Sequence, residues 1–280
     1  MTQANQRKEK VWFITGSSRG FGRIWTEAAL KRGDNVVATA RNLESIADLK
    51  AAYGNHVLIL AVDVINAEQV KSAIDQAHKH FGRLDIVFNN AGYSLVGTIE
   101  ESKPEEIRAL YETNIIGPVN VLQAAIPYLR EQGYGHILGT SSALGMYSNP
   151  LIGYYSSSKF AFEAIYDSMA KEVRPFGINV TIIEPGAYNT EFGSRESLKF
   201  AGRHIEAYDT FKQEVMDGIG QLERGNPQAT VNAIFAVVDE ENPPLRLLLG
   251  KHELPKIKEV FNDRIKVWEA WKEISAAAQG

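Results

Sequence analysis

Short apolar segments alternate with helical segments along most of the chain, and this alternation strongly limits the folds it can adopt. A helix between two strands returns the chain to the same edge of a sheet, which makes neighbouring strands parallel. The apolar segments are nearly continuous, as in strands buried on both faces. The sequence therefore predicts an α/β fold, a Rossmann-type doubly wound parallel sheet of about seven strands with helices on both faces. The expected strands are residues 11–14, 36–40, 56–62, 84–88, 135–142, 178–184 and 245–249.

The expected helices follow these strands and end at recognisable residues. Gly33 and Gly82 are placed to stop the first and third helices because glycine readily adopts the left-handed conformation of a helix end. The helices are expected at residues 24–30, 43–53, 67–81, 104–130, 154–173, 229–238 and 256–274.

Polar and glycine-rich segments follow several of the predicted strands. Ligands of such sheets bind beyond the carboxyl ends of the strands. The turn 15–22, Asp63, the segment 89–92, Ser142 and the segment 185–190 all lie at those ends. The sequence therefore predicts that they share one site.

The turn after the first strand has the pattern Thr15-Gly16-x-x-x-Gly20-x-Gly22 and opens a helix. Glycines let the backbone approach a pyrophosphate, and a helix N-terminus offers free N–H groups and a favourable dipole. A plain glycine turn would not need this position between a strand and a helix. We therefore expect dinucleotide binding here.

The end of the second strand indicates which dinucleotide binds. An acidic residue at this place holds the ribose 2′-hydroxyl of NAD, but the chain has Ala40 followed by Arg41. A guanidinium suits a 2′-phosphate, and Arg19 in the glycine turn is a second candidate for it. The expected cofactor is NADP(H), with NAD(H) less favoured.

Tyr155 and Lys159 are four residues apart at the start of a predicted helix, so they lie one turn apart on one face. A free tyrosine has a pKa of about 10, and an ammonium at ~4 Å favours the phenolate by about 4 kcal/mol at an effective dielectric of ~20. Such a pair can move a proton on or off an alcohol oxygen. Ser142, at the end of a strand, could donate a hydrogen bond to the same oxygen.

Gly117 and Pro118 interrupt the helix predicted over 104–130. Pro118 has no N–H for the carbonyl four residues earlier, and its ring crowds that carbonyl. We expect a kink that leaves the carbonyl of Asn114 free for a water or another ligand, although a simple packing kink would have the same sequence.

Together these motifs resemble the short-chain dehydrogenase/reductase family. The resemblance covers residues 11 to about 249 and rests on the order of the motifs and on the place of Ser142, thirteen residues before Tyr155. The motifs are Thr15-Gly16-x-x-x-Gly20-x-Gly22, Asn89-Asn90-Ala91-Gly92, Asn114, Ser142, Tyr155-x-x-x-Lys159 and Pro185-Gly186-x-x-x-Thr190.

The resemblance implies a role for each of these residues. Tyr155 would be the general acid/base, Ser142 would hold the substrate oxygen, and Lys159 would lower the Tyr155 pKa and bind the nicotinamide ribose. Asn114 would support a proton relay through its main-chain carbonyl. The pyrophosphate would lie on Gly16, Gly20 and Gly22, the adenine on Asp63 and Val64, the adenosine side on Asn90 and the nicotinamide end on Thr190. The remaining residues of the expected cofactor site are Ser18, Phe21, Ala91, Gly92, Pro185, Gly186 and Tyr188.

The leading hypothesis is an oxidoreductase that interconverts a carbonyl compound (a ketone or an aldehyde) and an alcohol by hydride transfer with NADP(H). One alternative is a catalytically silent NADP(H)-binding regulator, although such a protein is expected to have lost part of the Ser142, Tyr155 and Lys159 set. Another is a sugar-nucleotide epimerase or dehydratase, which resembles Gly-x-x-Gly-x-x-Gly in the glycine turn and has a larger substrate region.

The composition of the chain argues against several classes of binding partner. A net charge of −4 gives no basic surface for nucleic acid, and no segment is long enough for a membrane span. The chain has no cysteine and its histidines are scattered, so we expect no metal site and a cytoplasmic location. The resemblance also implies a homodimer or homotetramer paired through helices 104–130 and 154–173.

The expected layout is a polar tail at residues 1–10, a single binding and catalytic domain at 11–250 and a helical extension at 251–280. Within the domain, residues 188–225 carry Phe192, Phe200, Tyr208 and Phe211 among charges. A flap over the site and ordinary helix packing explain these aromatics equally well. A flap of this kind, together with Tyr188, favours an apolar substrate.

Overall fold

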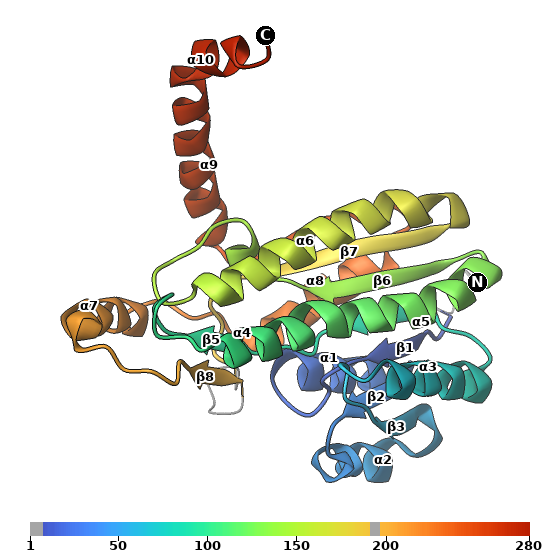
Figure 1. Cartoon of the computed structure of the whole chain (residues 1–280). Helices are drawn as coiled ribbons and strands as arrows, with labels where there is room; N and C mark the ends of the chain where they lie inside the picture. Colours follow the sequence, from blue (N-terminus) through green and yellow to red (C-terminus); the bar gives the residue numbers. More distant parts are fainter. Residues whose placement is uncertain (1–7, 191–196) are drawn as a thin grey trace.

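The computed structural model describes residues 8–190 and 197–280, which form one layered α/β body and a projecting C-terminal arm (Figure 1). The strands are β1 Val11–Ile14, β2 Asn35–Ala40, β3 Val57–Ala61, β4 Ile86–Asn89, β5 Ser94–Val96, β6 Gly135–Thr140, β7 Ile178–Pro185, β8 Leu198–Phe200 and β9 Arg246–Leu249. The α-helices are α1 Gly20–Lys31, α2 Ala47–Tyr53, α3 Ala67–Phe81, α4 Pro104–Tyr111, α5 Gly117–Gln132, α6 Gly153–Val173, α7 Asp209–Gly220, α8 Thr230–Asp239, α9 Glu253–Ala270 and α10 Lys272–Ala277.

Seven strands form one parallel sheet in the order β3-β2-β1-β4-β6-β7-β9. The order reverses beside β1, which is the switch point where such sheets bind ligands. The register brings the carboxyl ends together, with Ile14 beside Ala38 and Phe88, and Pro185 beside Leu249. The predicted doubly wound parallel sheet of about seven strands is confirmed.

The two faces of the sheet have separate hydrophobic cores. One core joins the strands to α3, α5 and α6 through buried side chains such as Ile74, Leu129 and Phe162. The other joins them to α1, α2 and α8 through Trp25, Leu49 and others. Each strand contributes side chains to both faces because successive residues point in opposite directions, which explains the continuous apolar runs.

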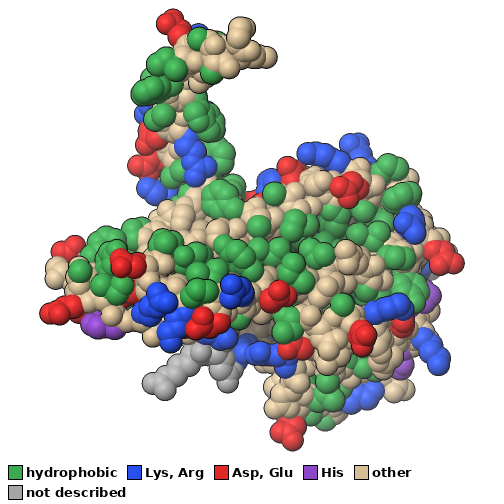
Figure 2. Space-filling view, in the orientation of Figure 1, with side chains coloured by type: hydrophobic (Ala, Val, Ile, Leu, Met, Phe, Trp, Pro, Cys, Tyr) green, Lys and Arg blue, Asp and Glu red, His purple; other side chains and the backbone are tan. Residues whose placement is uncertain are grey.

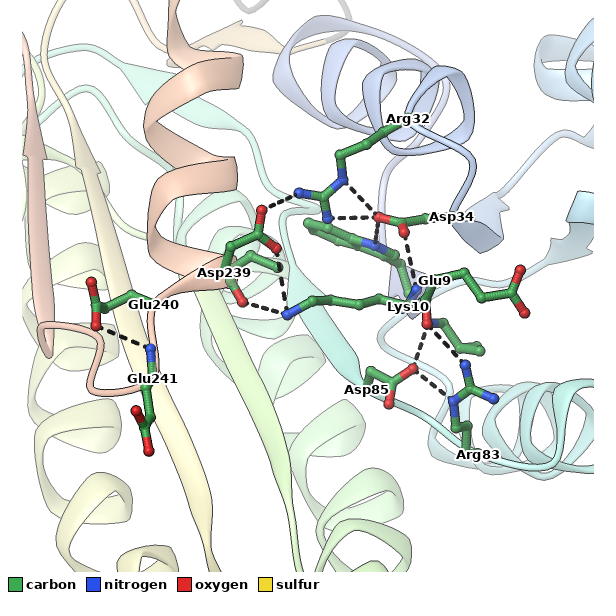
Figure 3. A network of polar contacts seen from close by, with 12 residues as sticks. Glu9, Lys10, Arg32, Asp34, Arg83, Asp85, Asp239, Glu240 and Glu241 are labelled. Atoms are coloured by element: carbon green, nitrogen blue, oxygen red, sulfur yellow. Dashed lines mark hydrogen bonds and ion pairs between the residues drawn. The ribbon is translucent and has the colours of Figure 1, made fainter. Parts of the chain in front are cut away.

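A network of hydrogen bonds and ion pairs at the amino ends of the strands joins β1, the end of α1 and α8 (Figure 3). The carboxylate of Asp34, which is fully buried, accepts from the backbone N–H of Lys10, the indole of Trp12 and the guanidinium of Arg32. Lys10 Nζ also donates to the carbonyl of Val238 at 2.6 Å. The last residue of the expected tail is therefore fixed to β1, α1 and α8, at the edge of the sheet opposite the predicted site.

Two parts of the fold differ from the sequence-based expectation. The helix expected over 104–130 is divided into α4 and α5 by a π-helical turn at Glu112–Ile116, so the irregularity begins before Pro118. The strands β5 and β8 were not predicted, and they pair in parallel as a small second sheet next to α4 (Figure 1). Each has three residues, too few for an alternating pattern to be visible in the sequence.

Among residues 8–190 and 197–280, no helix combines the length and apolarity that crossing a bilayer requires. Within the same residues, no three acidic or histidine side chains lie close enough together to hold a metal ion.

Candidate active site

A cavity of about 1690 Å³ opens at the carboxyl ends of the parallel strands. It brings together most of the residues that the sequence singled out. The expected residues that line it are Gly16, Ser18, Arg19, Gly20, Phe21, Arg41, Asp63, Val64, Asn90, Ala91, Gly92, Ser142, Tyr155, Lys159, Pro185, Gly186, Tyr188 and Thr190. Gly22 and Asn114 do not line it.

The glycine turn forms one end of the cavity. Gly16 and Gly20 have positive φ angles of 71° and 54°, which L side chains rarely adopt. The helix α1 begins at Gly20 with no side-chain cap and no acidic residue in its first turn. Its N–H groups and dipole therefore remain available for an anion.

Gly22 supports this turn from behind. A Cβ on Gly22 would lie 2.2 Å from the carbonyl oxygen of Gly16 and 2.3 Å from the amide nitrogen of Asn90. That amide donates to the carbonyls of Thr15, at 3.0 Å, and Gly16, at 3.3 Å. Gly22 thus lets α1 pack against the turn, and Asn90 fixes the shape of the turn while lining the cavity.

Two guanidinium groups lie on the wall next to the glycine turn. Arg19 precedes α1, and Arg41 follows β2, which ends at the buried Ala40. Arg41 is exposed, and its charge acts on the phenol of Tyr93, whose pKa burial raises and Arg41 lowers. The end of β2 therefore presents positive charge to the cavity and no carboxylate.

Tyr155 and Lys159 project from the first turns of α6 into the same cavity, and both are buried. The ammonium of Lys159 donates to the carbonyl of Thr140 at 2.7 Å and lies 5.7 Å from the centre of the Tyr155 ring. Ser142 follows β6. Its hydroxyl accepts from the N–H of Leu144 at 3.1 Å and also bonds the Tyr155 phenol.

Gly139 on β6 sets how closely α6 can approach the sheet. A Cβ there would lie 2.4 Å from the ring of Tyr166 and 2.5 Å from that of Phe162, both on α6. The hydroxyl of Tyr166 accepts from the amide of Asn89 at 2.8 Å. The packing and this hydrogen bond fix α6 and so place Tyr155 and Lys159.

Tyr155 and Lys159 are both buried, and burial disfavours the charged form of each side chain. Burial raises the pKa of Tyr155 to about 12, although the Ser142 hydroxyl opposes this. Burial likewise lowers the pKa of Lys159 to about 8, although Glu163 opposes this. Loss of water dominates at the phenol and the ammonium faces Thr140, so the expected lowering of the Tyr155 pKa by Lys159 stays a prediction.

Asn114 lies in the π-helical turn and is buried behind the cavity. Its side chain accepts from the N–H of Tyr93 at 3.1 Å and donates to the Tyr93 carbonyl at 2.9 Å. It also donates to the hydroxyl of Ser158 at 3.1 Å, which donates in turn to the Tyr155 carbonyl. Asn114 therefore joins the segment after β4 to α6, and a π-helical turn is a frequent feature of functional sites.

Several lining residues were not predicted. They include the apolar residues Leu144, Tyr147, Leu151, Ile152, Met216, Ile219 and Leu222. Residues 143–152 connect Ser142 to Tyr155, so their place beside the site could have been inferred from the two motifs. Glu253 and Lys256 also line the cavity, and their position after β9 follows the same strand-end rule.

The segment 188–225 reaches the cavity with different side chains from those expected. The expected aromatic side chains Phe200, Tyr208 and Phe211 do not line the cavity. The aliphatic side chains of Met216 and Leu222 line it instead. Phe200 and Phe211 are exposed, and the Tyr208 hydroxyl donates to Glu100 at 2.9 Å. Phe192 lies outside the described residues. The segment lines the cavity through Met216 and Ile219 of α7 and Leu222 of the turn after it, and its role as a flap stays a prediction.

Comparison with known proteins agrees with this geometry. Residues 10–199 match the family model for short chain dehydrogenase. Oxidoreductase BOA17 of Botryotinia fuckeliana is 36% identical over 272 residues, covering 96% of this chain and 99% of that protein. A 3-ketodihydrosphingosine reductase of Bacteroides thetaiotaomicron is 34% identical over 245 residues, covering 86% of this chain and 88% of that protein.

The solved structures show the same similarity. The crystal structure of a short-chain dehydrogenase from Streptomyces avermitilis superposes with a TM-score of 0.89 at 34% identity, covering 96% of this chain and 99% of that one. The chain belongs to the short-chain dehydrogenase/reductase family and is an oxidoreductase of that family. Structures named as short-chain dehydrogenases and sharing this fold have been solved with NAD in one case and with NADP in another.

Proposed function

We propose that the chain is an NADP(H)-dependent carbonyl reductase or alcohol dehydrogenase in which Tyr155 is the general acid/base. The observation that carries the proposal is the meeting of Ser142, Tyr155 and Lys159 with the uncapped N-terminus of α1 in one cavity. When bound, the cofactor would supply or accept the hydride. The residues fit it because the glycine turn leaves N–H groups for a pyrophosphate and Arg19 and Arg41 flank the end of β2.

The residues of this chain would orient the substrate, transfer the proton and bind the nicotinamide ribose. Ser142 would orient the substrate oxygen, and Tyr155 would give its phenolic proton to that oxygen during reduction or take it during oxidation. At neutral pH the phenol is the protonated acid, because burial holds its pKa at about 12. Lys159 would bind the nicotinamide ribose, and its positive charge would stabilise the phenolate left after proton transfer.

The cofactor preference rests on charge at the end of β2. Ala40 offers no acceptor for a ribose 2′-hydroxyl, and the exposed Arg41 suits a 2′-phosphate. A preference for NADP in turn favours reduction of a carbonyl as the direction of the reaction in the cell. We also propose that the protein acts in the cytoplasm.

The substrate would be apolar. Aliphatic and aromatic side chains line part of the cavity outside the expected cofactor site, among them Tyr147, Leu151, Ile152 and Met216. Together with a cavity of about 1690 Å³, this favours a bulky ketone, aldehyde or secondary alcohol. The protein named 3-ketodihydrosphingosine reductase, 34% identical, would act on a substrate of this apolar kind.

We also propose a homodimer or homotetramer that pairs through α4, α5 and α6. Ile116, in the π-helical turn between α4 and α5, and Phe160 of α6 are 42% and 38% exposed in the single chain. Pairing of the helices would remove this apolar surface from water.

Replacement of Tyr155 by phenylalanine tests the mechanism, and Tyr154→Phe is the matched control. Tyr154 is the adjacent residue, and its hydroxyl donates to the Ile99 carbonyl. In a panel of apolar aldehydes and ketones, Tyr155→Phe should abolish NADPH oxidation and leave NADPH binding intact, while Tyr154→Phe stays active. Full activity of Tyr155→Phe would refute the mechanism, and binding without turnover in the wild-type protein would favour a silent regulator.

A further inference from the structure

The first residue of α9 brings a carboxylate into the cavity, at the point where the C-terminal arm leaves the body (Figure 1). This residue is Glu253, and the hydroxyl of Tyr147 donates to its Oε2 at 3.1 Å. The start of the helix is anchored, because Ile257 is buried with Tyr147 and Ala143. The carboxylate of Glu253 therefore has a defined position in the cavity wall.

The backbone at the ends of β7 and β9 leaves room for this side chain. A Cβ on Gly186 would lie 2.1 Å from Oε1 of Glu253, and a Cβ on Gly250 would lie 3.3 Å from its Cγ. Any side chain at Gly186 would displace the carboxylate. Glu253 is thus packed directly against the segment that we expect at the nicotinamide end of the cofactor.

The carboxylate also lies near the residue that we expect to hold the substrate oxygen. The Ser142 hydroxyl donates to the carbonyl of Pro185 at 3.4 Å, and Gly186 is the next residue along the chain. With standard backbone dimensions, these contacts put Oε1 of Glu253 within about 10 Å of the Ser142 hydroxyl. Tyr147, which binds the other oxygen, belongs to the segment after Ser142. A substrate held by Ser142 would therefore lie within reach of Glu253.

Among residues 8–190 and 197–280, no basic side chain forms an ion pair with this carboxylate. The lysines on either side of Glu253 in the sequence pair with other acids, Lys251 with Glu223 at 2.6 Å and Lys256 with Glu259 at 3.0 Å. Acidic and basic side chains also lie together on the surface of the arm near the body (Figure 2). The carboxylate of Glu253 faces the cavity instead, with a neutral phenol as its hydrogen-bond donor.

Two properties of the surroundings show that this position is more than a helix start. The helix dipole favours an acidic residue in the first turn, but it does not require the side chain to bond Tyr147 inside the cavity. Burial raises the pKa of Tyr147 to about 12, and Glu253 adds to this. Burial and Glu253 likewise raise the pKa of Tyr188, another lining residue. Both phenols therefore stay neutral and leave the charge of a carboxylate uncompensated.

We propose that Glu253 is a specificity-determining residue that binds an ammonium group of the substrate, so that the preferred substrates are apolar carbonyl compounds that also carry an amine. This inference rests on the proposed function, because it concerns the substrate of the same reaction. A substrate that fills the cavity removes water from the carboxylate, and a desolvated charge is costly unless it is paired. An ammonium supplies that pair, a neutral group does not, and an anionic group is repelled.

Kinetics with matched ketones test the proposal. The substrates are acetophenones with an aminomethyl, hydroxymethyl, ethyl or carboxymethyl group in the para position. The aminomethyl ketone should have a kcat/KM about 10- to 100-fold above that of the ethyl ketone, as expected for a charged hydrogen bond. Glu253→Gln keeps the size of the side chain and should abolish this ratio. Glu269→Gln makes the same change at an exposed position of α9 outside the cavity and should preserve it.

Three results of these measurements would overturn the proposal. One is the same ratio in Glu253→Gln and the wild-type protein. Another is an equal gain from the hydroxymethyl ketone, because a neutral donor would then be sufficient. The third is a tenfold or greater loss of NADPH affinity in Glu253→Gln, since this would assign the carboxylate to the cofactor.

Binding of octylamine examines the same contact without turnover. By calorimetry in the presence of NADP(H), the wild-type protein should bind octylamine about tenfold or more tightly than octanol, and Glu253→Gln should remove the difference. If the wild-type protein reduces none of the ketones but shows this difference, the proposed reaction is refuted and the amine site is supported. Equal affinity for octylamine and octanol would refute the amine site, whichever ketones are reduced.

Discussion

Glu163 lies one helical turn beyond Lys159 on α6, and both side chains are buried. One carboxylate oxygen of Glu163 is paired with Arg246, and the other is buried without a hydrogen-bond partner. Arg246 also donates to Glu184 at 3.2 Å. A negative charge is thus held on the side of Lys159 away from the cavity, where it helps to keep the ammonium protonated.

Replacing Glu163 by glutamine should therefore shift the pH dependence of NADPH binding. Burial lowers the pKa of Lys159 to about 8 and Glu163 opposes this, so removing the carboxylate lowers the pKa further. The alkaline loss of NADPH binding should move to lower pH by about one unit, which corresponds to about 1.4 kcal/mol. Measuring the affinity for NADPH at a series of pH values determines this shift. Glu172→Gln, an exposed substitution on α6, should not shift the profile, and the same profile for Glu163→Gln and wild type would disprove the coupling.

Arg41→Asp should change the cofactor preference. Loss of a charged hydrogen bond to a 2′-phosphate costs about 1.5–3 kcal/mol, so NADPH should bind about 10- to 100-fold more weakly. NADH binding should be kept or improved, because Asp can accept from the 2′-hydroxyl. Arg174→Asp makes the same charge change at the far end of α6 and should alter neither affinity. Wild-type protein that binds NADH as tightly as NADPH would show that the assignment of NADP(H) is wrong.

His136 should make the fold sensitive to acid. Its Nε2 lies 2.9 Å from the Thr181 hydroxyl, and burial lowers its pKa from 6.5 to about 3. Because the folded-state pKa is depressed, the unfolded state takes up a proton first as the pH falls from 6.5 towards 3. Stability is then lost over that window.

The measurement is urea unfolding at pH 7 and pH 4.5. From the two pKa values, His136 alone should cost about 3 kcal/mol between these conditions. His136→Gln keeps a donor for Thr181 and does not titrate, so its loss should be smaller by about that amount. His204→Gln is the control because His204 is exposed. Equal losses for His136→Gln and wild type would contradict the assignment.

The sequence was sufficient to predict the sheet and the residues at its carboxyl edge. Tyr155 and Lys159 are joined by helix periodicity, and they meet Ser142 and Gly16 because parallel strands end at one edge. Arg246 and Glu163 are 83 positions apart, and β5 and β8 are too short to show a period. Such contacts depend on the packing of distant segments. The balance of burial and hydrogen bonding that sets the Tyr155 pKa depends on the same packing.

Gly22→Ala should damage the cofactor site without removing any group that lines it. The added Cβ would lie 2.2 Å from the Gly16 carbonyl and 2.3 Å from the Asn90 amide, so α1 and the glycine turn must separate. Such overpacking costs about 1–3 kcal/mol of stability, and NADPH binding should weaken with it. Gly218→Ala, in α7, meets no atom within 4 Å and should stabilise the fold by about 0.4–1 kcal/mol. Urea unfolding and NADPH titration of both variants measure this, and unchanged binding in Gly22→Ala would show that the turn can move without loss of function.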